Sequence, residues 1–567
     1  MGFILRIGTV SLALVSLAAA SLSKRDYSLP WRPQVHFTPP QDWMNDPNGL
    51  FRDASGLWHM YYQYADTLDP GNDKSWGSAT SENLLAWTNL PIAINDISGV
   101  SSIWSGSAVI DSENTSGLFP NQTNGVVAFY TSWTSTKQSQ FMAYSSDNGL
   151  TFTNYPGNPV IDLNITDFRD PKVLFYAPTN SWILVVSHAV DGFIAFYRST
   201  DLKVWTQVST FSHPAIQGVL ECPQFITIPL RENIWDPNST ILDVMYMLAI
   251  SDNSQSTVKY VPGNFDGTTF TPVSSFPVAT GGIAQSMDFG IDSYATAFYY
   301  GLDPTGNVVS TSWAVNLGYS TNVPTSSEGW ESAMSIPRNH FLVKGADDAY
   351  FLATLPVDVS SMRETTPVSF PALGNSQLIV DYSAIDSRVI EFYVTVSTPQ
   401  VSDNITTVLE FSSSATGENV QLQLTIPIAE SPTNRISAFT MSRAGITGWT
   451  NNGNLATEFT VPNVGPFNKT DVNGVTTETY EFHGVIDRTI LDVFLNGGIN
   501  SGTMIFFPQE SNMLDTMTLT VGGIANGSLS QVSLEAWGLK SGWEALTGES
   551  AQTGSQLKVV SFTQGTN

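Results

Sequence analysis

The sequence predicts an all-β protein, built as a five-bladed β-propeller followed by a C-terminal β-sandwich. Short runs rich in Val, Ile, Tyr, Phe and Trp, such as residues 57–64, 126–131 and 182–187, alternate with Gly, Asn, Asp and Pro. This pattern is typical of strands joined by turns. Stretches with the 3.6-residue period of an amphipathic helix are hard to find. A turn motif also recurs through the first two thirds of the chain, and this recurrence predicts blades.

The composition indicates a globular protein and excludes several classes of partner. The chain has 567 residues, of which 42% are hydrophobic and 13% charged, enough apolar material for more than one core. Its net charge of −27 disfavours nucleic acid and anionic membrane surfaces, which carry the same sign. A single cysteine, Cys222, excludes an intrachain disulfide and a cysteine-based metal site. The six histidines lack metal-ligand spacing, so we predict no metal site.

The N-terminus reads as a secretion signal. Residues 1–20 combine a basic start, an apolar run and small residues at the end, Ala18–Ala20. The dibasic pair Lys24-Arg25 adds a second processing site, so residues 1–25 are predicted to be signal peptide and propeptide. Seven Asn-x-Ser/Thr sequons are present, at Asn114, Asn121, Asn164, Asn238, Asn404, Asn468 and Asn526. We therefore expect a secreted, N-glycosylated protein, extracellular or in the cell wall, without a membrane anchor.

The repeat consists of a strand end, an acidic or amide turn and an aromatic residue. It occurs at residues 81–87, 145–152, 199–205 and 263–270, and the aromatic residues recur at steps of 65, 53 and 65 residues. Units of this length hold four short strands, so about five of them fill residues 33–355 as propeller blades. The alternative is that such turns recur in any all-β protein.

The C-terminal third has a different character. Pro356, Pro367 and Pro371 mark a linker. Alternating strands follow, with Asn496-Gly497-Gly498 as a hairpin turn, and they predict a sandwich over residues 373–540. The Gly/Ser/Thr/Gln-rich residues 541–567 are expected to be a loose tail.

The chemistry of the sequence points to carbohydrates. No Gly-x-Ser-x-Gly, His-Glu-x-x-His, Walker or Gly-x-Gly-x-x-Gly motif is present. Carboxylates, amides and tryptophans remain, and sugar sites use these for acid, base and nucleophilic steps and for stacking.

Three acidic residues have unusual neighbours. Asp46 lies in Trp-Met-Asn-Asp-Pro-Asn-Gly at 43–49, where tight turns surround one carboxylate, and its amide neighbours Asn45 and Asn48 are expected to bond to it. Asp170 follows Arg169, which we expect to hold it ionised. Glu221 lies in an apolar segment, a setting typical of a general acid. A turn or cap is the plainer role for each alone, but successive units can point all three into one central channel.

These motifs, in this order, resemble the signatures of glycoside hydrolase family 32, the invertases, inulinases and related fructosyltransferases. The quoted motifs are residues 43–49, Phe-Arg-Asp-Pro at 168–171 and Glu-Cys-Pro at 221–223, with further matches at 62–64, 76–81, 104–107, 288–290 and 487–494. The resemblance implies an axial pocket in which Asp46 attacks the anomeric carbon of a terminal β-D-fructofuranoside. It implies that Glu221 is the acid and base, and that Asp170 holds fructose hydroxyls. No metal or organic cofactor is expected, because two carboxylates supply both the covalent step and the proton transfers. The fructose subsite would contain Trp43, Asn45, Gln63, Trp76, Trp104, Ser105 and Arg169.

Two positions depart from the family pattern. Ser78 stands where these enzymes often carry histidine, and Leu317 where they usually carry tryptophan. Neither is a catalytic carboxylate, but both could reshape the acceptor side of the pocket. Preference among sucrose, inulin and levan therefore stays open.

Several alternatives remain beside a retaining β-fructofuranosidase. A fructosyltransferase differs only in whether a sugar or water intercepts the fructosyl-enzyme, and an exo-inulinase or levanase differs in substrate length. A lectin would predict a broken catalytic set, and an inverting arabinan-type hydrolase lacks the 43–49 motif. Retention predicts carboxyl groups of Asp46 and Glu221 about 5–5.5 Å apart. The predicted partners are sucrose or a fructan, with a homo-oligomer through the sandwich as a further alternative.

Overall fold

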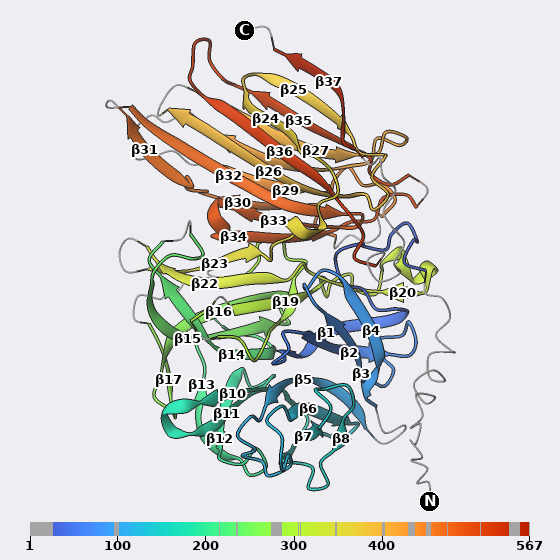
Figure 1. Cartoon of the computed structure of the whole chain (residues 1–567), viewed down its shortest axis with the longest axis vertical. Helices are drawn as coiled ribbons and strands as arrows, with labels where there is room; N and C mark the ends of the chain where they lie inside the picture. The colour runs from blue at the N-terminus through green and yellow to red at the C-terminus, as the bar shows by residue number, and fades with distance from the viewer. Residues whose placement is uncertain are drawn as a thin grey trace, which may run out of the picture.

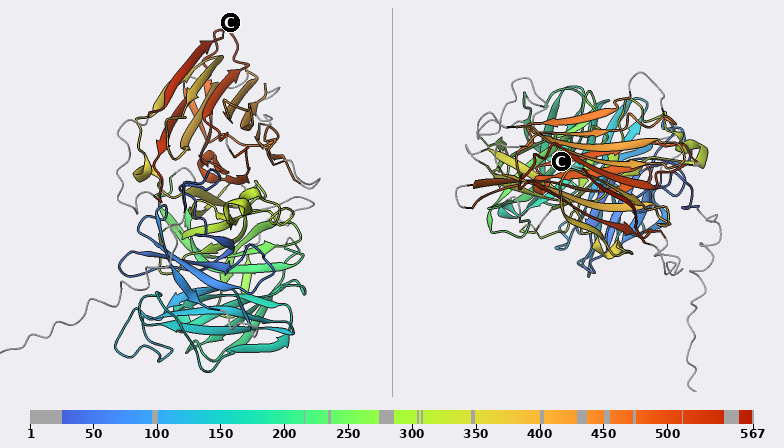
Figure 2. Two further views of the ribbon diagram at one scale, coloured as in Figure 1. Left: turned by 90° about the vertical axis from the view of Figure 1, so that its right-hand side faces the viewer. Right: turned by 90° about the horizontal axis from the view of Figure 1, so that it is seen from above.

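The computed structural model describes residues 26–565, apart from gaps at 96–100, 215, 234–235, 274–285, 304, 307, 346–348, 400–402, 429–436, 450–454, 473–474, 511 and 544–555. The predicted signal peptide and propeptide, residues 1–25, lie outside the described residues. The molecule is all-β, as predicted, with a propeller below and a sandwich above in the view of Figure 1. Figure 2 shows the same two parts stacked along the longest axis.

The propeller consists of five units of four main strands each. The units are β1(Asp42–Arg52), β2(Trp58–Ala65), β3(Ser75–Ser81) and β4(Trp87–Ile94); β5(Ser102–Ile110), β6(Val126–Thr134), β7(Lys137–Ser145) and β8(Thr153–Asn154); β10(Phe168–Tyr176), β11(Ser181–His188), β12(Phe193–Ser199) and β13(Thr206–Phe211); β14(Leu220–Arg231), β15(Ile241–Asp252), β16(Thr257–Phe265) and β17(Phe270–Pro272); β18(Tyr294–Phe298), β19(Val308–Ala314), β22(Arg338–Lys344) and β23(Tyr350–Pro356). Short strands β9(Ile161–Ile165), β20(Trp330–Glu331) and β21(Ala333–Met334) pair at the sides. The first strand of each unit contacts the first strand of the next, and β18 contacts β1, so the five inner strands form a ring.

The repeated turn is the connection between the third and fourth strands of the first four blades. In each, one side-chain oxygen accepts backbone N–H groups of the residues that follow, at 2.7–3.0 Å. The acceptors are Asn83, Asp147, Asp201 and Asp266. The fifth blade closes differently, with the Gly345 N–H bonded to the Ala349 carbonyl. This difference explains why the sequence showed four copies of the turn for five blades.

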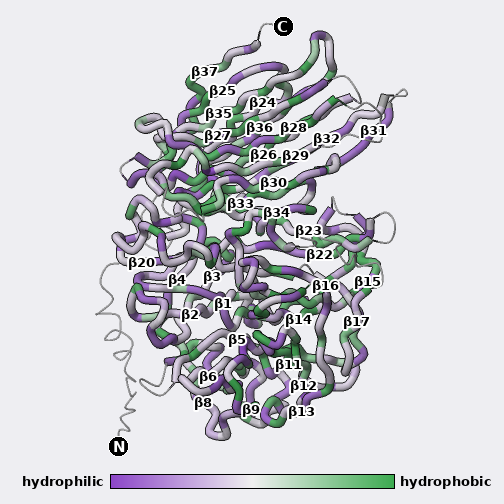
Figure 3. The backbone as a smooth tube through the Cα atoms, turned by 180° about the vertical axis from the view of Figure 1, so that it is seen from behind, coloured by the Kyte–Doolittle hydropathy of each residue, from purple (hydrophilic) through white to green (hydrophobic). Residues whose placement is uncertain are grey.

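Two sheets of seven strands each form the sandwich. One contains β24(Val368–Leu373), β36(Gln531–Leu539), β26(Val389–Pro399), β32(Val475–Asp487), β33(Ile490–Leu495) and β34(Asn500–Ile505), with β31(Asn468–Val472) at the side. The other runs β30(Glu458–Pro462), β29(Ala438–Ser442), β28(Asn419–Ile426), β27(Ile405–Ser412), β35(Thr516–Gly522), β25(Ser376–Asp381) and β37(Lys558–Gln564). Buried and partly exposed residues alternate along strands such as β27, and Figure 3 shows the matching alternation of hydropathy in the sandwich.

The tail predicted over residues 541–567 is wrong in part. Residues 558–564 form β37, which pairs with β25 as the edge of the second sheet. The turn-rich composition of residues 541–557 hid the short β-branched run at Val559-Val560. β24 likewise begins at Val368, inside the segment interpreted as a linker.

The N-terminal segment ties the propeller to the sandwich. The carboxylate of Asp487 accepts the backbone N–H groups of Gln34, Val35 and His36 at 2.8–3.0 Å. The fully buried ring of His36 lies between Asp487, at 2.9 Å, and Asp492, at 3.2 Å. Burial alone would lower the pKa of His36, but the hydrogen bonds and charges of the two carboxylates outweigh it and raise the pKa to about 9.

Among the described residues, no helix has the length and apolar character needed to cross a bilayer.

Candidate active site

The axial pocket lies where the N-terminal ends of the five inner strands meet, and its volume is about 500 Å³. Eight of the ten predicted site residues line it: Trp43, Asn45, Asp46, Gln63, Trp104, Arg169, Asp170 and Glu221. They come from four different blades, so only the closed ring brings them together.

Each predicted carboxylate sits at a β-bulge beside a proline. The pairing register shifts between Met44 and Pro47 on β1, between Arg169 and Lys172 on β10, and between Glu221 and Gln224 on β14. Proline cannot donate to the strand ladder, so Pro47, Pro171 and Pro223 interrupt it locally. A bulge re-aims the side chains next to it. The Asp-Pro and Glu-Cys-Pro sequences thus turn Asp46, Asp170 and Glu221 toward the axis.

Asp46 receives hydrogen bonds from two other blades, the second and the fourth. Its Oδ2 accepts from the Ser105 hydroxyl at 2.6 Å and from the Cys222 thiol at 3.4 Å. Burial raises the pKa of Asp46, and the charge of Glu221 raises it further, although bonds from Ser105, Asn45 and Cys222 oppose the shift. Asp46 and Glu221 are therefore electrostatically coupled.

Asp170 does not have the environment that its sequence neighbour suggested. It is 6% exposed, adopts a left-handed backbone conformation at φ 68°, and accepts the Cys222 N–H at 2.8 Å. Burial raises the pKa of Asp170 to about 7, since the charges of Glu221 and Asp46 add to burial and Arg169 only partly compensates. The expectation that Arg169 keeps Asp170 ionised is therefore wrong.

The guanidinium of Arg169 instead pairs with Glu221. Its Nε and Nη2 donate to Oε1 of Glu221 at 3.2 and 3.1 Å. The other oxygen, Oε2, accepts from Asn253 Nδ2 at 2.9 Å and from the Tyr294 hydroxyl at 2.6 Å. The apolar surroundings expected for Glu221 are thus replaced by four polar donors. These hydrogen bonds fix both oxygens of the proposed acid and base.

Two further predicted residues differ in their placement. Ser105 belongs to the site through Asp46, and the Gln63 amide donates to its hydroxyl. Trp76 does not line the axial pocket: it is fully buried, stacks on Tyr61 and donates its indole N–H to the Trp104 carbonyl at 3.0 Å. Its inclusion in the fructose subsite is wrong, because β3 lies two strands away from the inner strand of its blade.

Three smaller expectations are resolved as well. Asn48 does not bond to Asp46, since its amide oxygen accepts the Gly106 N–H at 3.0 Å. Ser78 is buried within β3 and away from the axial pocket. Leu317 does line the pocket, so only this one of the two departures touches the candidate site.

The residues missed from the sequence include three aromatic lining residues and Asn253. Tyr294 is the first residue of β18, the inner strand of the fifth blade. Asp46, Asp170 and Glu221 likewise lie near the start of the inner strands of their own blades. Trp133 and Trp313 lie near the ends of second strands β6 and β19, at the same end of the propeller. A register comparison between blades could have found these three, whereas Asn253 lies in a turn without a distinctive pattern.

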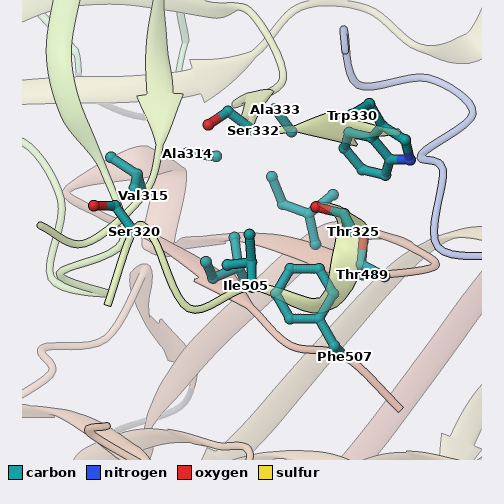
Figure 4. A pocket seen from close by; sticks show the side chains of 12 residues that line it. Ala314, Val315, Ser320, Thr325, Trp330, Ser332, Ala333, Thr489, Ile505 and Phe507 are labelled. Atoms are coloured by element: carbon teal, nitrogen blue, oxygen red, sulfur yellow. The ribbon is translucent and has the colours of Figure 1, made fainter. Parts of the chain in front are cut away.

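Two features outside the axial pocket were also considered as sites, a metal centre and a second cavity. In the ranges that the structure describes, no group of three or more His, Cys, Asp or Glu side chains could hold a metal ion. A second cavity, between the propeller and the sandwich, is lined by Trp330, Thr489 and Phe507 among others (Figure 4). Its volume of about 30 Å³ suits a water or two and excludes a sugar.

The comparisons with known proteins agree with this geometry. Residues 36–352 match the glycosyl hydrolases family 32 N-terminal domain. An invertase of Schizosaccharomyces pombe is 34% identical over 65% of this chain and 64% of its own length. An extracellular exo-inulinase of Meyerozyma guilliermondii is 33% identical over 86% of this chain and 92% of its own.

The solved structures include a fructofuranosidase from Schwanniomyces occidentalis complexed with fructose. It superposes with a TM-score of 0.78 at 27% identity and covers 92% of this chain and all of its own. Residues 36–352, the span of the family match, include all three carboxylates and the five inner strands. The chain belongs to glycoside hydrolase family 32.

Proposed function

We propose that this chain is a retaining β-fructofuranosidase that releases terminal fructose from sucrose and related fructosides. The observation that carries the proposal is the meeting of Asp46, Asp170 and Glu221 in one pocket, each aimed by a bulge of a different inner strand. Relatives named invertase and exo-inulinase support the substrate class.

Asp46 and Glu221 have separate roles in the proposed reaction. Asp46 attacks the anomeric carbon and forms the fructosyl ester while the glycosidic bond breaks, and Glu221 gives its proton to the leaving oxygen. In the second half, Glu221 removes a proton from water, and the resulting hydroxide displaces Asp46. Two inversions retain the configuration, and no further reagent is required.

Asp170 serves binding rather than proton transfer. With a pKa of about 7, it carries a proton at mildly acidic pH, where Asp46 must be ionised. A neutral carboxyl both donates and accepts hydrogen bonds, which suits paired fructose hydroxyls. Arg169, the one guanidinium in the pocket lining, limits the repulsion between the three acids.

The test is the anomer first released from sucrose, followed by NMR before mutarotation. Retention gives β-fructofuranose first, whereas initial α-anomer would contradict the role of Asp46. Asp46→Asn should abolish both turnover and any covalent fructosyl adduct detected by mass spectrometry, with unchanged thermal unfolding as its control.

Secretion and glycosylation are proposed on the N-terminal segment and the sequons. Six of the seven acceptor asparagines are exposed, and only Asn114 is half-buried, with its side-chain oxygen bonded to the Phe119 N–H at 2.8 Å. Intact-mass and N-terminal analysis of secreted material tests this. An unprocessed Met1 without glycan would contradict it.

A homo-oligomer through the sandwich is proposed on its edge strand. The exposed fractions of Val559, Val560 and Phe562 on β37 are 42%, 58% and 46%. An edge strand with exposed apolar side chains is a template for pairing with a second chain. Light scattering of the native chain and Val560→Lys tests it, and a monomeric native chain would contradict it.

A further inference from the structure

Two tryptophans of the second blade form a stack in the wall of the axial pocket. Trp104 lies in the bulge of β5 and Trp133 near the end of β6; their ring centroids are 5.4 Å apart and their planes differ by 3°. Both are half-buried and both line the pocket. Trp104 was expected to contact fructose, but Trp133 has no part in the proposed reaction. A flat indole face offers an apolar surface on which one side of a sugar ring can pack.

Trp133 lies opposite a residue that contacts the Glu221 side of the pocket. Trp133 is the cross-strand partner of Gln138 in the β6–β7 register, and such partners project their side chains on the same face of the sheet. Gln138 accepts from Arg169 Nη1 at 3.3 Å, and Arg169 Nη2 donates to Glu221 at 3.1 Å. In the proposed reaction Glu221 protonates the leaving oxygen, so the leaving sugar must lie beside Glu221, on the side of the pocket wall to which Trp133 belongs.

The rim of the pocket also supplies polar groups. Asn72 and Asp73 are exposed and line the same pocket. Lys74 holds their loop in place, since its ammonium donates to the carbonyls of Pro70 and Asn72 at 2.5 and 2.9 Å. An aromatic face together with carboxylate and amide side chains is the composition of a sugar subsite.

We propose that Trp133 is the stacking platform of the leaving-group subsite, which takes the glucosyl unit of sucrose or the penultimate unit of a fructan. This inference rests on the proposed function and adds the specificity residue. Since the second half of the reaction reverses the first, a sugar that intercepts the fructosyl-enzyme binds the same subsite. Trp133 therefore favours transfer to sugars over transfer to water.

The test compares two substrates that share fructose and differ in the leaving group. Methyl β-D-fructofuranoside leaves only methanol and cannot reach Trp133, whereas sucrose leaves glucose. Trp133→Ala should lower kcat/KM for sucrose about 3–10-fold and leave that for the methyl fructoside within about twofold. Trp133→Phe should retain most of the sucrose activity. Trp537→Ala, which removes a half-buried tryptophan of the sandwich, is the matched control and should change neither.

Each result of these measurements either supports or contradicts the proposed role of Trp133. An equal loss on both substrates, or no loss on sucrose, would overturn the role of Trp133. A wild-type chain that releases fructose from neither substrate would instead overturn the proposed function. In concentrated sucrose, the ratio of trisaccharide to free fructose should fall in Trp133→Ala by the same factor as kcat/KM. An unchanged ratio would contradict the shared subsite.

Discussion

The hydrogen bond from Tyr294 to Glu221 should hold the proposed acid and base in position during turnover. The Tyr294 hydroxyl donates to Oε2 at 2.6 Å and stabilises the ionised carboxylate. Removing it with Tyr294→Phe leaves Asn253 on that oxygen and Arg169 on the other. A hydrogen bond to a charged group contributes about 1.5–3 kcal/mol, and the remaining donors recover part of it. A net loss of about 1.4 kcal/mol corresponds to a tenfold fall in rate.

The assay is kcat/KM for sucrose, measured from released glucose. Since the Tyr294 hydroxyl orients Oε2 of the proposed acid and base, Tyr294→Phe should lower kcat/KM about tenfold. Tyr299→Phe is the matched control and should leave kcat/KM unchanged, because the buried Tyr299 hydroxyl forms no hydrogen bond with the residues that the structure describes.

An unchanged kcat/KM in Tyr294→Phe would refute this reasoning. The same loss in Tyr299→Phe would refute it too, because it would trace the change to general packing.

Three further results are expected. Glu221→Gln should lose about 10²–10⁴-fold in turnover on sucrose while still binding it in calorimetry, and near-native rates would show that another group is the acid. The carboxyl groups of Asp46 and Glu221 should lie about 5–5.5 Å apart in a crystal structure, and about 9 Å would indicate inversion. The raised pKa of His36 contributes stability that is complete below about pH 6.5 and is lost as the pH rises through about 9, up to about 3 kcal/mol. Urea unfolding at pH 6 and 9 checks this, and His36→Gln should flatten the difference.

The fold was predictable because its signals are local. Strand runs, the Asn83-type turns and the sandwich alternation each depend on a few consecutive residues. The same holds for the carboxylates, since Asp46-Pro47 and Asp170-Pro171 carry their bulges within two residues. Where a short segment determines its own conformation, that conformation can be predicted from the sequence.

The charge states were not predictable, because they depend on segments far apart in the chain. Arg169 is adjacent to Asp170 in sequence, yet its guanidinium binds Glu221, which is 52 residues away. Tyr294, on the fifth blade, supplies the shortest hydrogen bond to the same carboxylate. The prediction that Trp76 lines the fructose subsite was wrong for a related reason. A motif shows which residues are close in sequence, but not which face of a strand each side chain occupies. These hydrogen-bond partners of the carboxylates come together only when the ring of five blades has closed.

The sandwich contacts the two blades between which that ring closes. The ring of inner strands closes where β18 meets β1, a contact without covalent support, since the chain has a single cysteine. Asp487 binds the backbone that leads into β1, and Asp492 binds Arg338 at the start of β22 at 2.8 Å. Two carboxylates of one sandwich hairpin, β32–β33, therefore hold the first and the last blade together. Because β1 carries Asp46, these contacts also support the strand that holds the proposed nucleophile. The sandwich thus braces the blades of the candidate site, although no described sandwich residue lines the axial pocket.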